Sequence, residues 1–273
     1  MRRSTIGVFD SGFGGLTVLK ALLELVPAAD YVYFGDTARL PYGSKSVETV
    51  ARYAVEAAHY LESHGAQMLV IACNTATALA LDQITAAARV PVIGVVEPGA
   101  SAATSASRNR KIVVIGTDAT VSSHAYRKAL ESRGLQAREK ACPLLVPLVE
   151  EGWVDHPVTE QVASIYLGEA FADGFHDADT LVLGCTHYPL LKPLLARVTP
   201  EHVRIVDSAE STAREVATHF KQLVPAAADA SEERRANPRL RFFATDSTEK
   251  FQRLGQRFLG HTIDTVEHVD LKE

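Results

Sequence analysis

The sequence predicts an α/β fold made of two pseudosymmetric three-layer domains with mainly parallel sheets, and three observations support this prediction. Short apolar, β-branched runs alternate with longer segments of helical period, which is typical of parallel sheets covered by helices. The chain repeats one arrangement of strands and motifs in its two halves. Its 273 residues, 47% of them hydrophobic, are enough to build two cores of moderate size.

Strands are expected where short apolar runs lie between turn or helix signals. They cover Thr5–Phe9, Tyr31–Phe34, Met68–Ala72, Val92–Val95, Ile112–Ile115, Thr180–Leu183, Val203–Val206 and Leu240–Phe243. The helical period between these runs predicts helices at Leu16–Leu25, Val47–Ser63, Ala76–Ala88, Thr120–Ser132, Thr159–Phe171, Ser211–Leu223 and Ser247–Phe258.

The internal repeat is clearest in the segments that open and close each half. Ile6-Gly7-Val8-Phe9-Asp10-Ser11 opens the first half, and Ile112-Val113-Val114-Ile115-Gly116-Thr117-Asp118 opens the second. Later in each half a strand ends in a cysteine that small polar residues follow, in Ala72-Cys73-Asn74-Thr75 and in Gly184-Cys185-Thr186. Each cysteine follows its opening segment by a similar length of chain, so we expect two similar domains.

The domain boundaries are expected at two places where turn chemistry follows a strand. Glu97-Pro98-Gly99 reads as a turn, and the small-residue stretch Ala100–Ser107 follows it. A return crossing near Asp207-Ser208 gives a first domain of residues 1–97 plus 208–273 and a second domain of residues 98–207. The charged run Asp229–Arg241 is expected to be a solvated surface segment.

Charge and cysteine usage exclude several classes of protein. The 28 Lys and Arg against 33 Asp and Glu give a net charge of -5, which offers no basic surface to a nucleic acid. Three cysteines argue against a disulfide framework and for a reducing compartment. The apolar run Ile6–Phe9 is too short for a signal peptide core, and no run approaches the ~18 residues of a membrane span. We expect a cytoplasmic protein with no membrane partner.

The two cysteine turns carry the strongest chemical signal. In open parallel sheets, ligands bind at the carboxyl ends of the strands, where Cys73 and Cys185 are expected. A following helix start favours a thiolate and also binds a carboxylate. Two such thiols, facing one carbon from opposite sides of a cleft between the domains, would invert a stereocentre. Cys142, which lies in no such turn, is expected to be structural.

Other motifs allow more than one interpretation from the residues alone. The glycines after Asp10 fail the dinucleotide fingerprint because Thr17 stands where its third glycine belongs, so they indicate a tight turn or close approach to a small ligand. Asp10 itself could be a cap. His187 could orient a neighbouring group or lie on the surface, and a metal site of Cys73, Cys185, His187 and Asp10 lacks any closely spaced ligand pair.

Two further segments give only a weak functional signal when the local sequence is considered alone. Glu150 follows an apolar run and would be a surface carboxylate, and Tyr42-Gly43 after Pro41 would be a simple turn that could also reach over a site.

These motifs together closely resemble the glutamate racemase family, within the cofactor-independent aspartate and glutamate racemases. The resemblance spans most of the chain and rests on Asp10-Ser11-Gly12-Phe13-Gly14-Gly15-Leu16, Pro41-Tyr42-Gly43, Ala72-Cys73-Asn74-Thr75-Ala76-Thr77, Pro147-Leu148-Val149-Glu150 and Leu183-Gly184-Cys185-Thr186-His187-Tyr188-Pro189.

The resemblance implies a two-base reaction without a cofactor or a metal. Cys73 would take the α-proton of D-glutamate and Cys185 that of L-glutamate. Asp10 would assist Cys73, His187 would assist Cys185, and Glu150 would support the site. It further implies that the substrate is held by Asp10, Ser11, Tyr42, Gly43, Asn74, Thr75, Thr186 and His187.

The family also implies a biological setting and a substrate preference. His187 favours glutamate, because related aspartate racemases tend to carry a glutamate at this position. D-Glutamate would supply peptidoglycan synthesis. A homodimer is expected because dimers are the commonest soluble assembly.

Two other functions fit the same fold. One cysteine alone could act as a nucleophile or proton donor in a decarboxylase or hydrolase, in which case only one cysteine variant would lose activity. A binding module could close its two domains on glutamate without exchanging the α-proton.

Overall fold

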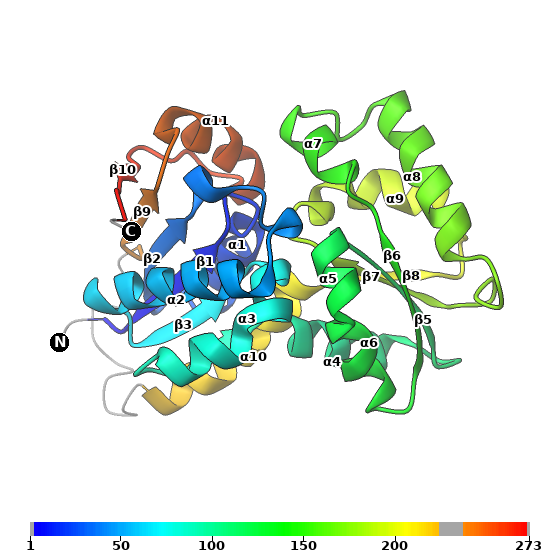
Figure 1. Ribbon diagram of the computed structural model, residues 1–273, viewed down its shortest axis with the longest axis horizontal. Coiled ribbons are helices and arrows are strands. Elements are labelled where there is room, and N and C mark those ends of the chain that lie inside the picture. The colour runs from blue at the N-terminus through cyan, green and yellow to red at the C-terminus, as the bar shows by residue number, and fades with distance from the viewer. Residues whose placement is uncertain (1–2, 224–236, 272–273) are drawn as a thin grey trace.

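The computed structural model describes residues 3–223 and 237–271, and in this part of the chain the strands form two parallel sheets. The six-stranded sheet has the order β10-β9-β2-β1-β3-β4. Its strands are β1 (Thr5–Asp10), β2 (Asp30–Gly35), β3 (Met68–Ile71), β4 (Val92–Gly94), β9 (Leu240–Ala244) and β10 (Glu267–His268). Figure 1 shows this sheet and its helices beside the second sheet.

The second sheet repeats the strand order of the first. It has four strands in the order β6-β5-β7-β8, all parallel: β5 (Lys111–Gly116), β6 (Gln136–Ala141), β7 (Thr180–Gly184) and β8 (Arg204–Asp207). The first strand of each half lies between the second and the third, and the fourth pairs with the third. This confirms the predicted fold, and it makes β3 and β7, which precede the two cysteines, topologically equivalent.

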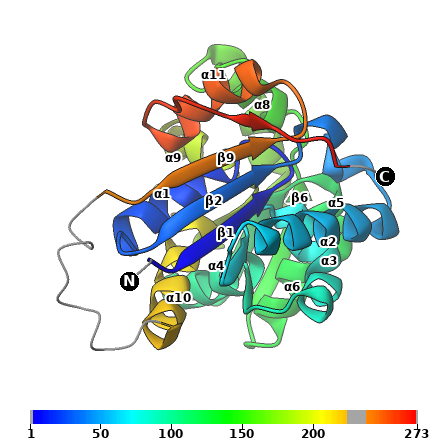
Figure 2. The ribbon, with the colours of Figure 1, turned by 90° about the vertical axis from the view of Figure 1, so that its left-hand side faces the viewer.

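Helices cover both faces of each sheet, which gives three layers per half. On the first sheet, α2 (Val47–Ser63) and α3 (Asn74–Ala87) pack on one face and α1 (Leu16–Leu25), α10 (Ser208–Leu223) and α11 (Thr248–Leu259) on the other (Figure 2). On the second sheet, α4 (Val96–Ala106) and α6 (Ala125–Glu131) oppose α7 (Leu145–Glu150), α8 (Pro157–Ala170) and α9 (Lys192–Val198). The remaining elements are α5 (Asp118–Ser123) and the 3-10 helices at Thr37–Arg39, Tyr42–Ser44 and Tyr188–Leu191.

One hydrophobic core runs through both halves on the side of α1 and α7. It joins the inward side chains of β1, such as Ile6 and Val8, to Val113 and Ile115 of β5. α10 starts directly after β8 ends at Asp207, and it packs against both α1 and α4. The two sheets are therefore held together by shared apolar packing as well as by the chain crossings.

The turn expected at Glu97-Pro98-Gly99 is wrong, because these residues belong to the first turns of α4. Proline is tolerated there, since an N–H group in the first turn has no partner within the helix. Gly99 lies against Tyr126, and a Cβ atom at this position would be 3.0 Å from the Tyr126 hydroxyl. The small residues that suggested a loop allow close helix packing instead.

One further sequence expectation requires correction, and a second is tested only in part. The single helix expected at Thr120–Ser132 is two helices, because His124 adopts a left-handed conformation with φ 54° and ends α5. Of the charged run Asp229–Arg241, residues 229–236 lie outside the described residues. Arg241 is exposed, as expected for a solvated segment, and it lies in β9, where it forms an ion pair with Glu267 of β10 at 3.0 Å.

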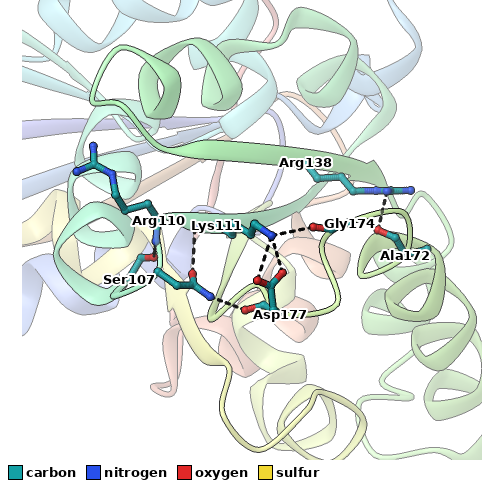
Figure 3. A network of polar contacts seen from close by, with 8 residues as sticks. Ser107, Arg110, Lys111, Arg138, Ala172, Gly174 and Asp177 are labelled. Atoms are coloured by element: carbon teal, nitrogen blue, oxygen red, sulfur yellow. Dashed lines mark hydrogen bonds and ion pairs between the residues drawn. The ribbon is translucent and has the colours of Figure 1, made fainter.

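A polar network fastens the amino-terminal end of the second sheet, away from the cysteine turns (Figure 3). Lys111, which opens β5, lies 2.8 Å from Asp177 and donates a hydrogen bond to the carbonyl of Gly174. Arg138 of β6 donates to the carbonyl of Ala172 at 2.8 Å. These contacts hold the loop that precedes β7.

Candidate active site

A cavity of about 460 Å³ lies at the carboxyl ends of both sheets, where the residues singled out from the sequence converge. Cys73 and Cys185 both line it, one from each half of the chain. The other predicted residues that line it are Ser11, Tyr42, Gly43, Asn74, Thr75, Glu150, Thr186 and His187. Asp10 is the exception, since it is buried at the end of β1 and does not line the cavity.

Cys73 lies two residues beyond the end of β3 and is itself the N-cap of α3. Its Sγ accepts a hydrogen bond from the Ala76 amide at 3.4 Å and donates one to Ser11 Oγ at 3.4 Å. The sulfur of Cys73 therefore caps the helix itself, ahead of the small polar residues Asn74 and Thr75 that follow it. Burial and the neighbouring Asp10 raise the pKa of Cys73 to about 12, against the opposing effect of the bonds from Ser11 and Ala76.

Cys185 directly follows β7, and the chain after it differs from the chain after Cys73. A 3-10 helix at Tyr188–Leu191 takes the place of an α-helix start, and no side chain caps it. The helix start expected beside both cysteines is therefore present only at Cys73. At Cys185 a side chain takes the place of the helix start: the Cys185 Sγ lies 3.9 Å from Nδ1 of His187.

His187 links Cys185 to Glu150 and lies in a pocket of aromatic rings. Its Nε2 is 3.4 Å from Glu150 Oε1, an ion pair without good hydrogen-bond geometry. Its ring centroid is 5.9 Å from that of Phe13 and 5.1 Å from that of Phe258. Burial lowers the pKa of His187, but the contacts with Cys185 and Glu150 outweigh burial and raise it to about 10. The imidazole is protonated at neutral pH.

Glu150 is not the surface carboxylate that its local sequence suggests, because its side chain is only 21% exposed. α7 carries it to the cavity, where it contacts His187 and also Lys250. Burial raises the pKa of Glu150, but these two cationic partners bring it below its ordinary value.

Asp10 lies behind the cavity wall, where its charge acts on Cys73 and the charge of His187 acts on it. Its Oδ2 accepts a hydrogen bond from the Gly12 amide at 2.9 Å, while Oδ1 is buried without a partner among the described residues. Burial raises the pKa of Asp10. The charge of His187 and the hydrogen bonds from the amides of Gly12, Gly14 and Gly15 act in the opposite direction but do not cancel this rise.

Hydroxyl and amide groups join the two halves at the cavity wall. The Tyr126 hydroxyl donates to Asn74 Oδ1 at 2.7 Å, while Asn74 Nδ2 is buried with no partner in the described part of the chain. Thr75 Oγ1 lies 2.9 Å from Thr117 Oγ1 and 3.3 Å from Thr120 Oγ1. Donors from α3 are thus fixed by side chains from the second half.

The loop with Tyr42 and Gly43 reaches the cavity as a 3-10 helix. The Tyr42 hydroxyl donates to Asp36 Oδ2 at 2.5 Å, and Thr245 donates to Asp36 Oδ1 at 2.9 Å. Asp36 is fully buried, so this loop is tied to the six-stranded sheet by a carboxylate that never reaches solvent.

Several residues at the site were not found from the sequence. Thr117 lines the cavity, and the internal repeat could have found it, because it follows β5 as Asp10 and Ser11 lie at the end of β1. Lys250 also lines the cavity, but no motif surrounds it. Tyr126 and Asp36 do not line the cavity. Tyr126 is hydrogen-bonded to Asn74, and Asp36 is hydrogen-bonded to Tyr42, and both of these partners line it.

The described part of the chain contains neither a metal-binding cluster nor a membrane-spanning helix. Within residues 3–223 and 237–271, no group of three or more His, Cys, Asp or Glu side chains is arranged to hold a metal ion. None of the described helices is long and apolar enough to cross a bilayer.

Comparison with known proteins agrees with the fold and shows the family. The Asp/Glu/Hydantoin racemase family matches residues 6–216. The glutamate racemase of Koribacter versatilis is 60% identical over 99% of this chain and 98% of its own length. A glutamate racemase isoform of Bacillus anthracis has a TM-score of 0.90 at 39% identity, covering 99% of both chains. The enzyme of Francisella tularensis, solved with D-glutamate, has a TM-score of 0.87 at 34% identity, covering 98% of both. The family match over most of the chain and the 60% identical relative show that the chain belongs to the glutamate racemase family of amino-acid racemases.

Proposed function

We propose that this protein interconverts L-glutamate and D-glutamate by cofactor-independent proton transfer at Cα, with Cys73 and Cys185 as the two acid/base groups. The observation that carries the proposal is that both thiols line one cavity and follow topologically equivalent strands. Two proton-transfer groups that come from opposite halves of the chain suit a reaction that adds a proton to the face opposite the one it leaves.

The proton balance requires one thiolate and one thiol at the start of each turnover. With D-glutamate, the Cys73 thiolate takes the α-proton, and the electron pair of the broken C–H bond remains on Cα. The Cys185 thiol then delivers a proton to the other face of Cα. With L-glutamate the roles reverse. Burial and Asp10 raise the pKa of Cys73 to about 12, which makes the resting group a proton donor. The ammonium of a bound amino acid adds the positive charge that favours its thiolate.

Protonated His187 supplies a proton close to Cys185. Its Nδ1 is 3.9 Å from the sulfur, and Glu150 on the other side of the ring keeps the imidazole oriented. Asp10 would assist Cys73 without direct contact with the cavity: its charge acts on the thiol, and its Oδ1 has no partner among the residues that the structure describes.

The substrate carboxylates need donors, because the carbanion beside a carboxylate is poorly stabilised without a cofactor. The start of α3 supplies backbone N–H groups, and Asn74 Nδ2 is a buried donor without a partner in the described residues. By analogy with oxyanion-hole donors, each is worth roughly 2.7 to 4 kcal/mol when charge develops on carbon. The other groups that we assign to substrate binding are Ser11, Tyr42, Gly43, Thr75, Thr186 and His187, which line the cavity. Asp10 was also expected to hold the substrate, but it lies behind the cavity wall, so we assign it no direct contact with substrate.

Glutamate is proposed as the substrate from the relatives as well as from the cavity. The Francisella tularensis enzyme holds D-glutamate, and the Escherichia coli enzyme, 29% identical with a TM-score of 0.78, holds L-glutamate and an activator, UDP-MurNAc-Ala. We infer a role in supplying D-glutamate for peptidoglycan, in the cytoplasm and as a homodimer.

We also assign residues 1–97 with 208–273 to one domain and residues 98–207 to the other. In support, the strands of the six-stranded sheet all fall in the first set and those of the four-stranded sheet in the second.

The test is incubation of the protein with L-glutamate in deuterium oxide. We expect loss of optical rotation and α-deuteration of the product without any added cofactor. Cys73→Ser and Cys185→Ser should each lose activity by about 10²- to 10⁴-fold, the usual contribution of an acid/base group. Cys142→Ala is the matched control, because Cys142 is buried but does not line the cavity. Unchanged rotation with folded wild-type protein would exclude the function.

A sharp difference between the two cysteine variants would contradict the two-base reaction. If only one variant lost turnover, a single-cysteine decarboxylase or hydrolase would explain the site better, and release of carbon dioxide or ammonia would identify it. Binding of glutamate without exchange of the α-proton would instead indicate a binding module.

A further inference from the structure

Lys250 forms the one ion pair at the cavity that crosses between the halves of the chain among the described residues. It lies in α11, which packs on the six-stranded sheet, whereas its partner Glu150 ends α7 on the four-stranded sheet. Lys250 Nζ is 3.5 Å from Glu150 Oε2, and the side chain lines the cavity beside its partner. No role was given to Lys250 by the motifs or by the proposed reaction.

The ion pair alone would contribute little to stability. The Lys250 side chain is 49% exposed, and exposed ion pairs are worth about 0 to 1 kcal/mol. Glu150 is less exposed than Lys250 and has a second contact, because its other carboxylate oxygen lies 3.4 Å from Nε2 of His187. Each oxygen of Glu150 therefore has its own cation, one on either side.

This arrangement gives a continuous polar chain from α11 to the sulfur of Cys185. It runs from Lys250 to Glu150 at 3.5 Å, from Glu150 to His187 at 3.4 Å, and from His187 to Cys185 at 3.9 Å. Without Lys250, the Glu150 carboxylate would be free to rotate away from His187, because no other residue in the described part of the chain pairs with Oε2.

We propose that Lys250 is a positioning residue for the racemase reaction, which holds the Glu150 carboxylate so that His187 stays oriented toward Cys185. The inference rests on the proposed function, since it assigns Cys185 an acid/base role. Lys250 acts through Glu150 and does not itself exchange a proton with the substrate. Its place on α11 also makes this orientation depend on how the two halves sit around the cavity.

The charges that face this chain determine the expected pH effect. His187 faces Cys185, Glu150 and the buried Asp10, and Glu150 faces His187 and Lys250. Glu150 must be ionised to hold His187. Removing the Lys250 cation takes away a charge that favours the ionised form, so Glu150 will protonate at a higher pH. The acid limb of the activity profile should then move to higher pH.

The experiment compares Lys250→Met and Lys250→Arg with the wild-type protein on L-glutamate and on D-glutamate. For Lys250→Met we expect kcat to fall roughly three- to tenfold with KM changed less than about twofold, since a coupled network and not substrate binding is altered. Lys250→Arg keeps the cation and should recover most of kcat. Arg253→Met removes a charge from the same helix one turn away and is the matched control.

A double-mutant cycle shows whether Lys250 acts through Glu150. In a Glu150→Gln background, Lys250→Met should have no further effect on kcat and should no longer move the acid limb. Circular dichroism checks folding, and Lys250→Gln is a second variant that retains a polar end group.

Three results would overturn the role of Lys250. The first is a KM increase at constant kcat, which would make Lys250 a substrate-binding residue. The second is an equal effect of Lys250→Met in the wild type and in the Glu150→Gln background. The third is wild-type kinetics in Lys250→Met. A wild-type protein with no activity on glutamate would instead remove the proposed function itself.

Discussion

Gly14 and His187 lie in contact across the two halves of the chain, and only the absence of a side chain at Gly14 allows this. A Cβ atom at Gly14 would be 2.6 Å from Nδ1 of His187 and closer still to Oγ1 of Thr186. The glycine-rich turn after β1 therefore accepts a histidine from the other half. It forms the tight turn that the sequence allowed, at Gly14-Gly15, and it also serves close packing of two chain segments.

Gly14→Ala should impair the site more than the fold. The added methyl group must displace His187 or Thr186, and overpacking of this kind typically costs about 1 to 3 kcal/mol. We expect kcat/KM for racemisation to fall at least tenfold, a shift of about 1.4 kcal/mol, with a smaller loss in urea-unfolding stability. Gly168→Ala is the control, because a Cβ atom there meets nothing within 4 Å in helix α8. A Gly14→Ala enzyme as active as the control would refute the steric argument.

Tyr126→Phe should weaken substrate binding through Asn74. The lost hydroxyl leaves Asn74 Oδ1 buried without its donor, which costs about 1 to 3 kcal/mol of folding free energy. Because the Asn74 amide then loses its fixed orientation, KM for glutamate should rise. Tyr166→Phe removes only a long contact of 3.4 Å to an exposed amide and should change neither quantity. Equal behaviour of the two variants would show that the Tyr126 hydroxyl does not orient Asn74.

The sequence predicted the repeated sheets because apolar strand runs and the cysteine turns are local patterns. It missed β6 at Gln136–Ala141, whose charged side chains hide an edge strand. That strand completes the match in strand order that makes β3 and β7 equivalent. The sequence also could not give the partner of Glu150, since residues 150 and 250 come together only when α11 and α7 pack around the cavity.

Asp36→Ala should loosen the Tyr42 loop without changing the acid/base groups. Asp36 accepts hydrogen bonds from Tyr42 and Thr245 in a fully buried position, and burial raises its pKa against the effect of these donors. Losing the acceptor leaves two donors unsatisfied, at a cost of about 1 to 3 kcal/mol each. We expect a higher KM and faster proteolysis within residues 37–45, while kcat falls less than KM rises. A kcat defect with an unchanged KM would show that the loop does not hold substrate.

His187 should contribute stability that depends on pH in a defined direction. Contacts with Cys185 and Glu150 outweigh burial and raise its pKa from the ordinary value of 6.5 to about 10. A group with a raised folded-state pKa stabilises fully below its unfolded-state pKa and loses this contribution as pH rises through the folded-state value, at about 1.4 kcal/mol per unit.

The free energy of unfolding of the wild type and of His187→Gln, measured in urea at several pH values, tests this contribution. Their difference should be largest near pH ~6 and shrink toward pH ~10, because the protonated imidazole is then no longer bound more tightly in the folded state. His202→Gln, at an exposed position, is the control variant for loss of a histidine. A difference that stays constant or grows with pH would mean that His187 is not held protonated between Cys185 and Glu150, and that the proton near Cys185 has another source.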